Sequence, residues 1–144
     1  MPTCFLDTSA IIKRYIDEPN SAAFDAFFLS GEFDFVLSPL VITEITSAIA
    51  KRARQRDITT AFASATKQIF YDEVLTGSWE LMEFPSSAFS EAAGLISSLN
   101  IPLAALDALH LACALYSQAS ALATADKQLA TAATKSGLQV FTFF

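Results

Sequence analysis

The chain alternates short apolar runs with longer stretches in which apolar residues recur at helical spacing. Most of the short runs are rich in aromatic or branched residues and are bounded by Gly, Pro or Ser, which is typical of strands. Five runs are therefore predicted to be strands, ALATA being the weakest of them: TCFLD (3–7), FDFVLS (33–38), WELMEF (79–84), ALATA (121–125) and QVFTFF (139–144).

The longer stretches between these runs carry the start and stop signals of helices. Gly31, Gly77 and Gly137 follow three of them, and Ser38 with Pro39 forms a typical helix start. The predicted helices cover residues 10–16, 20–30, 39–55, about 58–75, 86 or 87 to before 102, 103–118 and 126–136. This alternation predicts a single three-layer α/β domain over residues 1–144, with a mostly parallel sheet of about five strands covered on both faces.

Composition and charge narrow the classes of protein that fit this fold. The 144 residues are 53% hydrophobic, which suits one ordinary core, and no uninterrupted apolar stretch is long enough to suggest a membrane span. Without a signal-peptide pattern, we expect a cytoplasmic protein with Cys4 and Cys113 as reduced, buried thiols. A net charge of −6 disfavours bulk attraction to nucleic acid, so such a substrate would need a local basic patch or a metal.

Four acidic residues are predicted to face one edge of the sheet. Asp7 ends the first predicted strand and Asp126 follows ALATA, while Glu44 and Asp107 lie early in helices. The carboxyl ends of parallel strands form the usual ligand site of such folds. Asp126 is equally well explained as a helix N-cap, and Asp7 as a strand-end residue that bonds the next turn. Glu44 and Asp107 have mostly apolar helix neighbours, so their carboxylates need donors or a cation.

A bound metal is the simplest partner for these acids, because Lys and Arg are scarce around them. The available ligands are carboxylate oxygens and the hydroxyls of Thr8 and Ser9, with no cysteine cluster and a single histidine. Such a set selects Mg²⁺ or Mn²⁺ over Zn²⁺. Clustered acids around such ions suit the hydrolysis of a phosphodiester.

Four segments of the sequence resemble the signature segments of the PIN domain, specifically of VapC-type toxin ribonucleases: FLDTSA (5–10), the Glu of SPLVITEITSAIAK (38–51), LDALHLACA (106–114) and ATADKQL (123–129). The resemblance implies that Asp7, Glu44, Asp107 and Asp126 form an acidic pocket for Mg²⁺ or Mn²⁺, and that Thr124 supports this pocket by hydrogen bonding. It also implies an endoribonuclease, a homodimer, and an antitoxin whose tail blocks the site.

Three further features have two explanations each. The basic run KRARQR (51–56) offers Lys51, Arg52 and Arg54 as contacts for RNA phosphates, or it is a solvated helix end. His110, one turn after Asp107, either contacts Asp107 or the substrate, or is a packed or hydrogen-bonding core residue; we expect the core residue, without a catalytic role. The thirteen phenylalanines form a dense core, or some of them line a groove for a dimer partner or an antitoxin.

Two other classes of protein compete with the ribonuclease. In a haloacid-dehalogenase-like phosphatase the strand-end Asp7 would be a nucleophile, but that chemistry normally needs a second Asp two residues on, where this chain has Ser9. A PIN-like scaffold that only binds proteins is the third interpretation. Metal-dependent cleavage of RNA distinguishes the ribonuclease from the binding module, and covalent phosphorylation of Asp7 would indicate the phosphatase.

Overall fold

The five predicted strands form one sheet in the computed structural model, which describes residues 1–144. Every pair of neighbouring strands is parallel, and the order across the sheet is β3-β2-β1-β4-β5. The prediction of a mostly parallel sheet is confirmed, and ALATA forms a fully buried strand beside the central one. The strands are β1 (Thr3–Leu6), β2 (Asp34–Leu37), β3 (Glu80–Leu81), β4 (Ala121–Thr124) and β5 (Gln139–Thr142).

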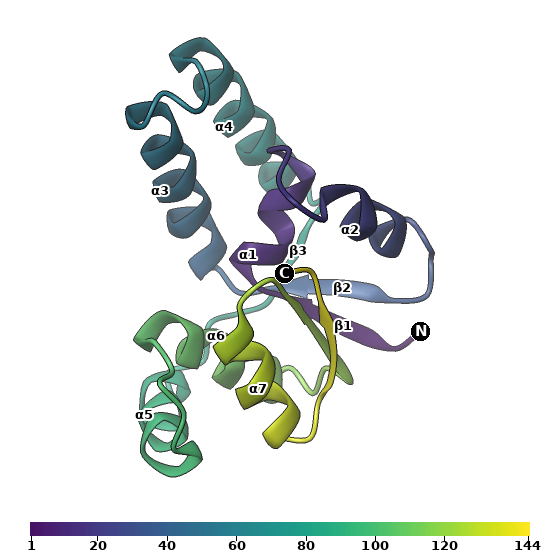
Figure 1. Cartoon of the computed structure of the whole chain (residues 1–144). Helices are drawn as coiled ribbons and strands as arrows, with labels where there is room; N and C mark the ends of the chain where they lie inside the picture. The colour runs from purple at the N-terminus through teal and green to yellow at the C-terminus, as the bar shows by residue number, and fades with distance from the viewer.

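Helices connect the strands and cover both faces of the sheet, as predicted (Figure 1). The first of them begins at Thr8, earlier than the apolar pattern indicates, because Asp7 caps it, and it tightens into a 3₁₀ turn after one turn of α-helix. The elements are α1 (Thr8–Ile11), η1 (Ile12–Arg14), α2 (Ser21–Phe28), α3 (Leu40–Arg54), α4 (Thr60–Leu75), α5 (Ala88–Leu99), α6 (Ala105–Tyr116) and α7 (Lys127–Lys135).

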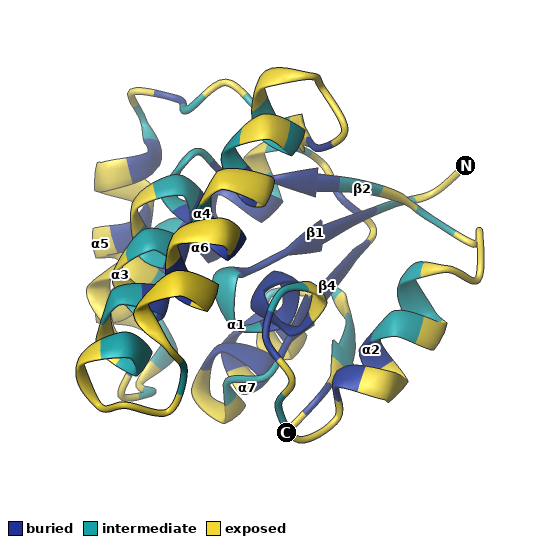
Figure 2. Ribbon diagram, turned by 90° about the horizontal axis from the view of Figure 1, so that it is seen from above, coloured by how far each residue is buried: buried dark blue, intermediate teal, exposed yellow.

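The two faces of the sheet carry two different cores. Side chains alternate along β1, so that Cys4 and Leu6 face one layer of helices and Phe5 faces the other. The first layer, from α1 to α4, contributes large residues, whereas α5, α6 and α7 contribute many alanines and leucines. In Figure 2 the central strands β1 and β4 are coloured as buried along most of their length. Both cysteines are free and buried, as predicted.

The phenylalanine-rich segment between residues 24 and 35 belongs to the first core. Its rings pack on one another and on the last strand, where the Phe27 and Phe141 ring centroids lie 4.7 Å apart. Phe24 is fully buried and meets Phe143 edge to face. The dense-core interpretation therefore holds for this segment.

Helices α3 and α4 extend beyond the sheet as an antiparallel pair (Figure 1). The start of α3 lies at the carboxyl end of β2, whereas its last turn, with the basic residues, lies far from the strands. One helix thus reaches from the sheet edge to a region outside it. None of the helices is sufficiently long and apolar to span a membrane.

Candidate functional site

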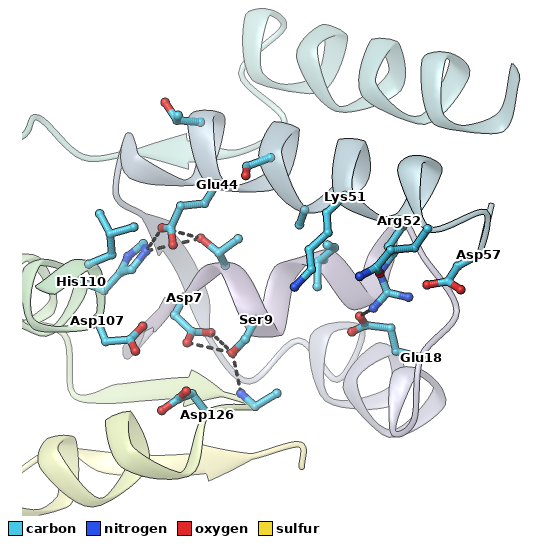
Figure 3. A pocket seen from close by; sticks show the side chains of 18 residues that line it. Asp7, Ser9, Glu18, Glu44, Lys51, Arg52, Asp57, Asp107, His110 and Asp126 are labelled. Atoms are coloured by element: carbon cyan, nitrogen blue, oxygen red, sulfur yellow. Dashed lines mark hydrogen bonds and ion pairs between the residues drawn. The ribbon is translucent and has the colours of Figure 1, made fainter. Parts of the chain in front are cut away.

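A cavity of about 810 Å³ opens at the carboxyl ends of the central strands, between α1, α3 and α6 (Figure 3). All four predicted acids line it, although they come from four separate parts of the chain. The predicted residues that line the cavity are Asp7, Thr8, Ser9, Glu44, Lys51, Arg52, Asp107 and Asp126, and His110 lies among them. The parallel sheet therefore brings the acids together as the strand order requires.

Asp7 is the most enclosed of the acids, with only 2% of its surface exposed. Its carboxylate accepts hydrogen bonds from the Ala10 amide at 2.9 Å, from the Thr124 hydroxyl at 2.6 Å, and from the Ser9 hydroxyl, which lies 2.8 Å from both oxygens. Burial raises the pKa of Asp7, and nearby His110 and these three donors partly oppose the rise. Asp7 is thus held in one orientation by two donors from α1 and one from the end of β4.

Thr124 and Ser9 join the end of β4 to the start of α1. The Thr124 hydroxyl accepts from the Asp126 amide at 3.0 Å, and the Ser9 hydroxyl accepts from the Ala125 amide at 2.8 Å. Asp126 caps α7 by accepting from the Leu129 amide at 2.8 Å. Both explanations of Asp126 therefore apply, because the same side chain caps a helix and lines the cavity.

Glu44 is held by two donors from other elements. The Thr8 hydroxyl donates to its Oε1 at 2.9 Å, and His110 Nε2 contacts the same oxygen. Burial raises the pKa of Glu44, but the hydrogen bond and charge of His110 and the Thr8 bond outweigh it, so the net shift is downward. His110 is a buried hydrogen-bonding residue, as the sequence predicts, but its partner is Glu44 and no hydrogen bond joins it to Asp107.

Asp107 has no hydrogen-bond or ion-pair partner among the protein side chains. Burial raises its pKa to about 6, the charges of Asp126, Asp7 and Glu44 add to the rise, and His110 opposes it. The acids therefore repel one another across the cavity. A cation placed among them would remove this repulsion.

The two cations of the lining lie at the far end of the cavity, which we call the basic end although Glu18 and Asp57 also line it. Lys51 and Arg52 come from the last turns of α3, and the Lys51 side chain points into the cavity (Figure 3). Arg52 pairs with Glu18, which also accepts from the nearly buried Lys13 at 3.2 Å. Lys13 donates in addition to the Pro19 carbonyl at 2.8 Å. The loop before α2 is thereby tied to the end of α3.

Arg54 does not line the cavity, so its predicted contact with RNA stays a prediction without support from this geometry. Glu18 and Asp57 do line it, and the sequence analysis missed both. Each lies in a connecting segment without periodic pattern, so nothing in the sequence distinguished it from an ordinary surface acid.

The residues around the acidic end fit a hard divalent cation. Its side chains offer carboxylate and hydroxyl oxygens, and neither cysteine lies there. No group of three or more His, Cys, Asp or Glu side chains is placed to hold a metal ion by itself, so water would have to supply much of the coordination of any bound ion. Asp107 and one oxygen of Asp126 are the carboxylate groups least engaged by protein donors. Such an open, water-filled arrangement is what Mg²⁺ commonly has in proteins.

The fold and the acid-lined cavity define an α/β domain with an acidic site at the carboxyl edge of its sheet. A family model of the PIN domain matches residues 4–135. The chain therefore belongs to the PIN domain family. No curated protein sequence is significantly similar to it.

Several solved structures share the fold over nearly the whole chain. The protein is similar to a chain of VapBC2 from Rickettsia felis bound to a promoter DNA fragment (15% identity, 99% of each chain, TM-score 0.67). It is also similar to Mycobacterium tuberculosis VapC20, a sarcin-ricin loop cleaving toxin (14% identity, 94% of this chain and 95% of that one, TM-score 0.70). A toxin-antitoxin complex from Klebsiella pneumoniae supplies a third match (15% identity, 98% of each chain, TM-score 0.64).

Proposed function

We propose that the protein is a metal-dependent endoribonuclease and the toxin of a toxin-antitoxin pair. The observation that carries this proposal is the set of four carboxylates on one cavity, none of which has a Lys or Arg partner. Membership of the PIN domain family and the toxins among the similar structures support the same activity.

In this proposal Asp7, Glu44, Asp107 and Asp126 hold Mg²⁺ or Mn²⁺. A bound ion of this kind lowers the pKa of an attacking water and stabilises the charge on the leaving oxygen. The hydroxyls of the supporting residues keep the carboxylates in place: Thr8 holds Glu44, and Ser9 and Thr124 hold Asp7.

The basic end of the cavity would bind RNA phosphates next to the one that is cleaved. Lys51 and Arg52 line the same cavity as the acids, so one strand of RNA can reach both ends. Both side chains are long and positively charged, and contacts of such side chains with phosphates do not depend on base sequence. RNA binding would therefore be local and would not need a basic protein.

The phosphatase alternative has less support. Ser9, at the position where such an enzyme would have its second Asp, is itself bonded to Asp7.

The partners and location proposed for the protein follow from the same activity. An antitoxin that presents an Arg or Lys to the acidic end would block it, because a cationic side chain there replaces the metal and excludes RNA. The ribonuclease would act in the cytoplasm as a homodimer. A co-purified partner that leaves RNA cleavage unchanged would contradict the blocking role.

The test is cleavage of RNA by the purified protein in Mg²⁺ or Mn²⁺, with EDTA as the metal-free comparison. Asp107→Asn removes one charge from the cavity and should slow cleavage by at least about 100-fold, because the site loses both a ligand and its stabilising charge. Glu91→Gln on the exposed face of α5 removes the same charge elsewhere and should leave the rate unchanged. Cleavage that persists in EDTA or in Asp107→Asn would refute the proposal.

A further inference from the structure

His110 contains the one buried side-chain nitrogen or oxygen in the protein that has no partner, its Nδ1 atom. The residue is only 1% exposed and lies on α6 among alanine and leucine side chains. An unpaired buried polar atom destabilises the folded state, and an apolar side chain at this position would avoid that cost. A histidine at this position therefore indicates that its other nitrogen, Nε2, makes an interaction that offsets this cost.

The contacts of Nε2 determine where the ring carries its proton. This nitrogen meets Oε1 of Glu44, and a carboxylate oxygen accepts hydrogen bonds, so the contact is attractive only when Nε2 bears the hydrogen. Nδ1 has no partner that would compete for the proton. Phe5 packs against the ring at 5.9 Å with an interplanar angle of 65°, which keeps the ring in place.

Glu44 receives both of its donors on a single oxygen. The Thr8 hydroxyl reaches Oε1 at 2.9 Å from α1, and His110 reaches the same atom from α6, 66 residues along the chain from Glu44. Oε2 has no protein partner, although the residue lines the cavity. The two donors thus fix the carboxylate plane and leave one defined oxygen available.

We infer that His110, together with Thr8, is a positioning residue that dedicates Oε2 of Glu44 to the bound cation. This inference rests on the proposed metal-dependent function, and it assigns to a residue outside the acidic set the task of orienting one ligand. Loss of a residue that hydrogen-bonds to a metal ligand and orients it typically lowers metal affinity by about 10–100-fold. The geometry predicts an effect on metal binding even when no RNA is present.

The experiment measures Mn²⁺ affinity of RNA-free protein by calorimetry or by the EPR signal of free Mn²⁺. His110→Leu should weaken Mn²⁺ binding by about 10-fold or more. His110→Gln, whose amide nitrogen extends to about the position of Nε2, should stay within about 3-fold of the unmodified protein, a difference below 1 kcal/mol. Affinity in His110→Leu equal to that of the unmodified protein, or affinity in His110→Gln as weak as in His110→Leu, would overturn the inference.

Thr8 provides a second, independent pair of variants if the His110 variants do not fold. Thr8→Val removes the other donor to Oε1 and should weaken Mn²⁺ binding, whereas Thr8→Ser keeps the hydroxyl and should restore it. Equal affinity of the two Thr8 variants would count against the inference. Asp107→Asn distinguishes the proposed metal site from the positioning role, since unchanged Mn²⁺ affinity in that variant would refute the metal site itself. Loss in Asp107→Asn with no effect at His110 or Thr8 would refute only the positioning role.

Discussion

The two ends of the cavity are built in opposite ways. At the acidic end, Asp7 and Glu44 are largely enclosed and are held by hydroxyl, ring and backbone donors from three or more elements. At the basic end, Lys51 is exposed and makes no hydrogen bond or ion pair, and the guanidinium of Arg52 bonds only to Glu18. The carboxylates of the acidic end are thus fixed by many hydrogen bonds, whereas the cations of the basic end make few.

In the proposed ribonuclease, this difference would separate two tasks, the chemical step and the binding of RNA. Chemistry requires oxygens held at defined positions, and short side chains at strand ends and helix starts provide them. Attraction of a flexible anion requires charge but little precision, and long side chains on a helix end provide that. Substitutions at the acidic end should therefore change stability and metal binding, whereas those at the basic end should change only affinity and its salt dependence.

The largest expected effect concerns Thr124, which connects the two central strands at the acidic end. Thr124→Val removes a buried donor to Asp7 and an acceptor for the Asp126 amide, so the free energy of unfolding should fall by about 2 kcal/mol. Thermal unfolding and denaturant titration measure the change. Thr131→Val is the matched control, because that hydroxyl lies on the exposed face of α7 and its loss should matter by less than about 0.5 kcal/mol. Equal effects of the two variants would show that the Thr124 hydroxyl stabilises the protein no more than an exposed hydroxyl does.

A smaller effect of opposite sign is expected for Asp107→Asn in metal-free protein. The pKa of Asp107 is raised to about 6 from 3.8, so the folded state disfavours the ionised form. This loss of stability is absent below about pH 4, because Asp107 is then protonated in both the folded and the unfolded state. It is complete above about pH 6, where the group is ionised in both states. Because Asp107 is only partly buried, the variant should gain about 1–2 kcal/mol at pH 7.5 after solvent screening.

Thermal unfolding of both proteins in EDTA, measured between pH 4 and pH 8, tests this expectation. The difference in melting temperature should grow with pH and reach its full size above pH 6. Glu91→Gln should show no such growth, since that carboxylate is exposed on α5. A difference that is independent of pH would show that repulsion among the acids is not its cause.

The smallest effect is expected at the basic end. Lys51→Ala should weaken RNA binding only about 3-fold, without changing stability, and should reduce the slope of log affinity against log salt by about 0.7 because one phosphate contact is lost. Filter binding with Asp107→Asn protein, which prevents cleavage, measures both quantities. Arg54→Ala is the matched comparison, because Arg54 lies on the same helix but outside the cavity. A larger effect at Arg54 would place the RNA on another face of α3.

Much of the fold could be predicted because the strands and helices obey local rules. The apolar runs and the Gly and Pro residues identify all five strands, although only two residues of WELMEF pair in the sheet. The early start of α1 depends on the Asp7 side chain, which accepts from the Ala10 amide, and a pattern of apolar residues does not reveal such a cap. Propensity also underrates ALATA, because its alanines suit a central position where helices pack closely on both faces.

The candidate site was predictable as far as strand ends determine it. Asp7 and Asp126 follow neighbouring parallel strands, so their meeting follows from topology. The contact of His110 with Glu44 joins α6 and α3 from the two helix layers across the edge of the sheet, and spacing within α6 indicates only its neighbour Asp107. Glu18 reaches the cavity through a loop whose path is set by Lys13 and Arg52, a tertiary arrangement without a local signature.

The pairing of β1 with β4 has a consequence for synthesis on the ribosome. Asp7 and Thr124 are 117 residues apart in the sequence. The central strand β1 pairs with β4, which lies near the other end of the chain. At about 5–20 residues per second, translation needs on the order of ten seconds to pass from one to the other. During this interval the emerging polypeptide carries Asp7 without the strand that orients it. The four carboxylates can meet only after residue 126 has left the exit tunnel, so the acidic end of the cavity forms only when synthesis is nearly finished.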